Sequence, residues 1–267
     1  MGKKFDFKWL ILIIVSVAVV GALLLMNPLV LPKNITYALS TDSFNLLALS
    51  FTQFLLLLGT GLFLLYRWRT TGKNNKTTLS WGVAFTVASL IVIESVLPSL
   101  NIILKGEVFL KIFALVRITH IIFLAGMYYG LALMMTSSKR IQIIPAVMII
   151  LVSLAWFIYG LFIVKNVAVT MTGFLYFISI PLTAVIAYMF LWYGNNNSMA
   201  SFKLIGFGFM TLTLIFLSWP LTFNAATDPP SATPLWTFGY HLFNILSLLP
   251  IFIGFILIPY EKGDRTP

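Results

Sequence analysis

Glu94, Arg117, His120 and His241 are ionisable residues that lie inside long apolar runs of the sequence. The run VRITHIIFLAGMYYG, residues 116–130, holds two of them three positions apart. A charged group in an apolar medium loses its hydration, so it must pair with an opposite charge, bond to polar groups or serve a ligand. Glu94 and Arg117 therefore predict an ion pair, and the two histidines predict groups that exchange a proton near neutral pH.

Three uses of these side chains remain open. In the leading hypothesis a small molecule or ion binds from the outer side and is sensed or transported, with Arg117 attracting an anionic group and Glu94 holding Arg117. His120, His241 and Asn244 complete this predicted ligand site. In the second hypothesis, His120 and His241 are the axial ligands of one b-type haem, or contact a quinone, in a membrane subunit of an electron-transfer complex. In the third, the contact between Glu94 and Arg117 only fixes the packing of two helices.

Several chemistries are excluded by the residues available. The sequence has no cysteine, which excludes disulfides, thiolate metal sites and cysteine nucleophiles. Glu94 is the only carboxylate within an apolar run, so paired-carboxylate catalysis and carboxylate-rich metal sites are not expected. No nucleophile elbow, phosphate-binding loop or HExxH motif occurs. We therefore expect no enzyme activity, no metal site and no cofactor, the haem alternative apart.

The composition indicates which structural elements hold these residues in place. Hydrophobic residues make up 60% of the 267 residues and charged residues only 9%, too few to cover a soluble protein of this length. A membrane-spanning helix needs about 20 apolar residues. The sequence predicts one all-α membrane domain, 1–267, that is a bundle of eight such helices, at 9–31, 44–66, 79–101, 109–136, 141–164, 169–193, 203–224 and 235–258.

Orientation follows from the basic residues, because Lys and Arg are retained on the cytoplasmic side of a membrane. With the N-terminus inside, twelve basic residues fall in inner segments and four in outer ones, which are Lys33, Lys105, Lys111 and Lys165. We therefore expect a multi-pass protein of the cell membrane with both termini cytoplasmic. The first segment is expected to stay as an anchor, and its removal as a signal peptide would leave seven helices with an outer N-terminus.

Counting residues along the helices places Glu94, Arg117, His120 and His241 at one level in the outer third of the bilayer. Polar residues also recur at helical spacing and are expected to face the bundle interior, where hydrogen-bond partners exist. These sets are Ser50, Gln53 and Thr60; Tyr176, Ser179 and Thr183; Thr211, Ser218 and Thr222; and His241 with Asn244.

Two further features concern contacts. Gly126 and Gly130 form a GxxxG motif, which lets another helix approach closely. The expected partners are the lipid bilayer and a cytoplasmic or membrane protein that contacts the basic inner segment 67–80 or the C-terminal tail. The basic residues are spread over separate short loops, so no nucleic-acid partner is expected.

Overall fold

The computed structural model describes residues 41–71, 75–92, 106–164, 170, 173–223 and 234–258, and these residues form helices and short links without a strand. The α-helices are α4 (Thr41–Thr71), α5 (Lys76–Ala88), α7 (Gly106–Met135), α8 (Lys139–Ile158), α10 (Ile180–Asn196), α11 (Ala200–Phe223) and α12 (Pro234–Leu257). A 3-10 helix, η1 (Ser89–Val92), continues α5, and two π-helices, η2 (Tyr159–Val164) and η3 (Leu175–Ser179), follow α8 and precede α10.

Five of these helical segments are long and apolar enough to cross a membrane. They are Leu47–Thr70, Val116–Met135, Lys139–Val164, Leu175–Asn196 and Ala200–Leu217. Two shorter apolar segments, Lys76–Val92 and His241–Leu257, overlap the predicted spans 79–101 and 235–258 in part, and residues 93–101 lie outside the described residues. The first predicted span, 9–31, lies outside the described residues. The all-α architecture is confirmed, and its apolar helices are compatible with a multi-pass membrane protein.

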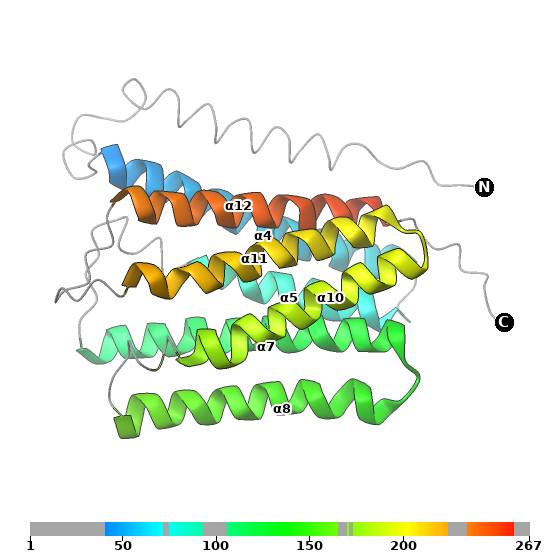
Figure 1. Ribbon diagram of the computed structural model, residues 1–267, viewed down its shortest axis with the longest axis horizontal. Helices are drawn as coiled ribbons and strands as arrows, with labels where there is room; N and C mark the ends of the chain where they lie inside the picture. The colour runs from blue at the N-terminus through cyan, green and yellow to red at the C-terminus, as the bar shows by residue number, and fades with distance from the viewer. Residues whose placement is uncertain are drawn as a thin grey trace.

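Six helices form a closed ring. Going round it, α4 packs on α5, α5 on α7, α7 on α10, α10 on α11, α11 on α12, and α12 returns to α4. The seventh, α8, contacts α7 and lies along the outside of the ring (Figure 1). Only 17% of the apolar stretch in Lys139–Val164 is buried within the structure, against 56% of the apolar stretch in Val116–Met135 of α7. Because α8 is also the most apolar segment, its exposed faces suit contact with lipid.

The ring is filled at its centre by an aromatic cluster, which we call the aromatic plug. It joins α5, α7, α10, α11 and α12, and ring centroids of its members lie 5.2–6.2 Å apart. Its members are all less than a tenth exposed. They are Trp81, Phe85, Phe123, Phe190, Phe209 and Phe255. Edge-on and tilted contacts of this kind add stabilisation beyond the area that each ring buries.

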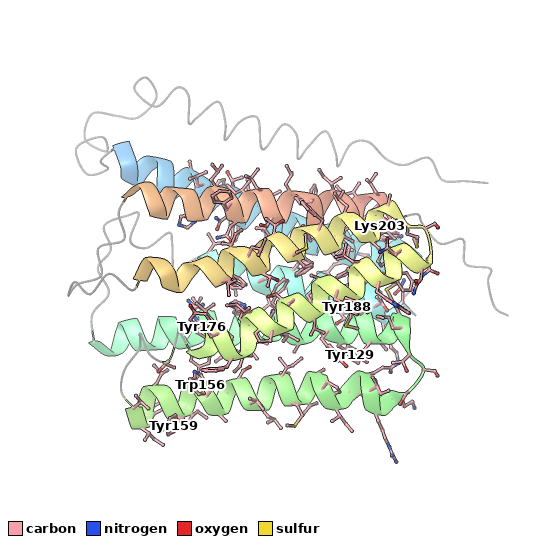
Figure 2. All side chains as sticks on the ribbon, in the orientation of Figure 1. Tyr129, Trp156, Tyr159, Tyr176, Tyr188 and Lys203 are labelled. Atoms are coloured by element: carbon pink, nitrogen blue, oxygen red, sulfur yellow. The ribbon has the colours of Figure 1, made fainter. Side chains whose placement is uncertain are left out.

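One end of the bundle carries nearly all of the described basic side chains. We call it the basic end, and it contains the end of α4, the start of α5 and the links α7–α8 and α10–α11, on the right of Figure 1. Lys203, at the start of α11, marks it in Figure 2. Its basic residues are Arg67, Arg69, Lys76, Lys139, Arg140 and Lys203, and no Asp or Glu occurs among the side chains that the structure describes. The opposite end has one described basic side chain, Arg117.

Helix packing at the GxxxG motif follows the sequence expectation. A Cβ atom added at Gly126 would lie 2.9 Å from the Cβ atom of Ala84 on α5. A Cβ atom at Gly130 would meet the indole of Trp81, whose Nε1 donates to the carbonyl oxygen of Met127 at 3.3 Å. The motif therefore brings α5 against α7 and positions one member of the aromatic plug.

Candidate functional site

Four of the five predicted site residues are described, and all four are buried. Arg117 is 6% exposed, His120 4%, His241 5% and Asn244 7%. Ile118, which follows Arg117, is 41% exposed, so Arg117 faces the bundle and its neighbour faces outwards. The fifth residue, Glu94, lies outside the described residues, as does its predicted contact with Arg117.

The described polar residues of this region share a depth. From the basic end of its own helix, Gln53 is 18 residues away (71 − 53), His120 15 (135 − 120), His241 16 (257 − 241) and Ser179 17 (196 − 179). At about 1.5 Å per residue these counts correspond to roughly 22–27 Å. With Ser50, one helical turn further along α4, the four side chains form one layer, on the far side of the aromatic plug from the basic end. We call it the polar layer.

His120 on α7 pairs with Ser179 at the end of η3. Its Nε2 atom lies 3.1 Å from Ser179 Oγ, and Ser179 is fully buried. Two phenyl rings enclose the imidazole, with Phe174 edge-on at 5.4 Å and Phe216 tilted at 5.7 Å between ring centroids. The other ring nitrogen, Nδ1, is buried and has no hydrogen-bond partner among the described residues.

His241 on α12 pairs with Gln53 on α4. The amide nitrogen Nε2 of Gln53 lies 3.0 Å from His241 Nδ1 and donates to the backbone oxygen of His241 at 2.9 Å. Ser50, one turn from Gln53 on the same helix, is fully buried, and its Oγ atom has no partner among the described residues. A buried polar atom without a partner costs about 1–3 kcal/mol unless a ligand or water satisfies it.

The polar faces predicted from helical spacing are mostly buried. Ser50, Gln53 and Thr60 on α4 are each at most 7% exposed, and Ser179 and Thr183 are fully buried. One predicted face, on α11, is described only at Thr211, which is half-buried, because the side chains of Ser218 and Thr222 are outside the described set.

Tyr176 is the exception, since it is 37% exposed and points away from this interior face. It lies in η3, a π-helix, which has more residues per turn than an α-helix. Counting by 3.6 therefore gives the wrong face for Tyr176. The buried positions run instead from Leu175 to Ser179 and Thr183, a spacing of four. Figure 2 shows Tyr176 near Trp156, at the end of the bundle opposite Lys203.

Sequence reasoning treated Gln53 and Ser179 only as parts of polar faces and did not identify the two aromatic neighbours of His120. The periodicity of Ser50 and Gln53, and of Ser179 and Thr183, did indicate which helix faces carry the partners. Phe174 and Phe216 gave no such signal, because phenylalanine is frequent throughout the sequence, at 24 residues.

The chemistry available to this layer is hydrogen bonding. Ser179 and His120 have the contact of a nucleophile and its base, but no described carboxylate orients Nδ1, as a catalytic triad requires. The described residues contain no group of three His, Cys, Asp or Glu that could hold a metal ion. Each histidine has one ring nitrogen engaged with a protein side chain, which favours a hydrogen-bonding role; the haem alternative stays a prediction.

Comparison with known proteins adds no further assignment: no protein-family model, curated protein or solved structure matches this chain.

Proposed function

We propose that this chain is a multi-pass protein of the cell membrane that binds a small molecule or ion from the outer side and senses it. The proposal includes eight spanning helices and cytoplasmic termini. Its orientation is supported by the basic end, where six basic side chains gather without a described acidic one. Positive charge of this kind is retained on the cytoplasmic side. The polar layer then lies in the outer half of the membrane.

The observation that carries the proposal is the polar layer with its two unsatisfied atoms, His120 Nδ1 and Ser50 Oγ. Buried polar atoms in helical proteins are nearly always hydrogen-bonded. In a spanning helix the lipid offers no substitute partner, so an unsatisfied imidazole nitrogen is expensive unless a ligand or water meets it.

Sensing is favoured over transport by the aromatic plug. The plug fills the ring between the polar layer and the basic end, and five of the six ring helices contribute to it. A ligand that reaches the polar layer from outside meets this packed cluster below it. The ligand can then alter how the helices pack and so change the basic end, where a cytoplasmic partner protein would contact Arg69, Lys139 or Arg140.

The test uses the absence of native cysteine, which makes every introduced cysteine the only thiol in the chain. Ser50→Cys and Ser179→Cys place a thiol in the polar layer at almost constant side-chain volume. Ser201→Cys, on a serine that is also buried but lies at the basic end, is the matched control. A charged, membrane-impermeant thiol reagent is added to intact cells, and labelling is measured on the purified protein.

We expect the two polar-layer variants to be labelled from outside and Ser201→Cys to stay unlabelled. If neither polar-layer cysteine reacts in intact cells, while each variant retains the melting temperature of the parent protein, the layer is closed and the structural role is the correct one. If Ser201→Cys alone reacts from outside, the proposed orientation is wrong.

A further inference from the structure

The hydrogen bonds of the polar layer determine which ring nitrogens of the two histidines carry hydrogen. For His241 the position of its own backbone carbonyl group shows which ring nitrogen carries the hydrogen. Gln53 must place its NH2 group, not its oxygen, within 2.9 Å of the backbone oxygen of His241. The same nitrogen lies 3.0 Å from Nδ1, so Nδ1 accepts a hydrogen bond. A neutral His241 therefore carries its hydrogen on Nε2.

For His120 the assignment follows from counting unsatisfied groups. If Ser179 donates its hydroxyl to Nε2, the only open donor of the pair is an N–H group at Nδ1. If Nε2 donates instead, the pair has two open groups, the hydroxyl hydrogen of Ser179 and the lone pair of Nδ1. Because each unsatisfied buried group is costly, the first arrangement is preferred. A neutral His120 then presents an N–H donor to the interior.

We infer that the polar layer binds a small monocarboxylate anion, whose oxygen accepts the hydrogen of His120 Nδ1. The inference rests on the proposed function and names its ligand class. His120 carries its N–H group on the nitrogen that faces away from Ser179, and Arg117 lies one helical turn from His120 on α7. An N–H donor near a positive charge suits an anion and opposes a metal cation or an ammonium group.

The rings of Phe174 and Phe216 beside His120 further restrict which anions the site would accept. A carboxylate with a short alkyl group can place that group against the phenyl rings and its oxygens towards the donors. A multiply charged anion such as phosphate would have to give up more hydration to enter the same surroundings. Chloride shares the charge but lacks the apolar group, so it serves as the discriminating probe.

The first experiment reads the hydrogen positions directly. The chain has only two histidines, so protein labelled with ¹⁵N-histidine and held in lipid nanodiscs gives four ring-nitrogen resonances. His241→Asn removes one pair and assigns the other. We expect His120 to carry hydrogen on Nδ1, and sodium acetate to shift that resonance in a saturable way. A hydrogen found on Nε2 of His120 would overturn the inference.

The second experiment separates the two nitrogens of His120 by substitution. The amide nitrogen of Asn lies close to where Nδ1 stands, and that of Gln lies close to where Nε2 stands. His120→Asn therefore keeps the donor to the ligand, whereas His120→Gln keeps the contact with Ser179 and loses the donor. The readout is the rise in melting temperature with acetate concentration, compared with the melting temperature of each variant without acetate.

We expect acetate to stabilise the parent protein and His120→Asn. Acetate should bind His120→Gln at least about tenfold more weakly, because this variant loses a hydrogen bond to a charged group. A response to chloride alone, or to tetramethylammonium in place of acetate, would overturn the monocarboxylate. So would the absence of any response. Labelling of Ser50→Cys and Ser179→Cys reports access to the polar layer whatever anion is used. A failure of the acetate experiment therefore leaves the proposed function standing, whereas a failure of the labelling experiment contradicts the proposed function itself.

Discussion

The contact of α11 with α12 at Gly208 allows a quantitative test of the ring. A Cβ atom added at Gly208 would lie 2.6 Å from the backbone oxygen of Ser247 and 3.2 Å from the backbone nitrogen of Ile251. Ordinary van der Waals contact begins at 3.4 Å, so Gly208→Ala requires a separation of about 0.8 Å (3.4 − 2.6). The oxygen belongs to the main chain and cannot rotate away. The two helices must therefore move apart.

Two effects of opposite sign decide the size of the change. Forcing a methyl group into a well-packed contact costs roughly 1–3 kcal/mol. Alanine in place of glycine within a helix returns at most about 1 kcal/mol. We expect the steric effect to win, so that Gly208→Ala lowers the free energy of unfolding by about 1–2 kcal/mol. Gly59→Ala is the matched control, because nothing lies within 4 Å of its added Cβ atom. It should leave stability unchanged or raise it by up to about 1 kcal/mol.

The assay is unfolding by sodium dodecyl sulfate in mixed micelles, followed by tryptophan fluorescence. The free energy of unfolding is obtained for the parent protein and for both alanine variants under the same conditions. The reasoning is refuted if Gly208→Ala unfolds within about 0.5 kcal/mol of the parent, since ordinary surface changes stay in that range. It is also refuted if Gly59→Ala is destabilised as strongly as Gly208→Ala.

Gln53, Ser198 and Asn197 offer three further tests. Gln53→Met removes both hydrogen bonds to His241 and should lower the free energy of unfolding by about 1 kcal/mol in the same titration, since each such bond in a membrane contributes about 0.6 kcal/mol. If Gln53→Met lowers the free energy of unfolding by the same amount in a His241→Leu background, the two residues are not coupled. Ser198 has a φ angle of 54°, so Ser198→Gly should raise stability by up to about 1 kcal/mol, and a decrease would contradict this. Asn197→Cys, at the basic end, should react with an impermeant thiol reagent only after cells are permeabilised, and labelling of intact cells would reverse the orientation.

The helices were largely predictable from the sequence. The predicted segments 44–66, 109–136 and 203–224 correspond to α4, α7 and α11, whose observed ends differ by at most five residues. This agreement has a local cause, because a spanning helix satisfies its own backbone hydrogen bonds and needs only a sufficient apolar length.

The faces of the helices were predictable only where the helix is regular. The spacing of Ser50, Gln53 and Thr60 indicated a buried face, and all three side chains are buried. The same counting failed at Tyr176, since the π-helical turn of η3 changes the angle between successive residues. η3 contacts α10 and α11, and counting at 3.6 residues per turn does not allow for such a turn.

The sequence by itself determined the apolar lengths, the charge asymmetry and the approximate depth of the histidines, since each depends on position along one chain. The partners were decided only by tertiary structure: Ser179 is 59 residues from His120, and Gln53 is 188 residues from His241. In a membrane, lipid is as apolar as the helix surfaces, so hydrophobicity does not select neighbours. The closing of the ring by α12 against α4 depends instead on the fit of side chains and on a few buried hydrogen bonds.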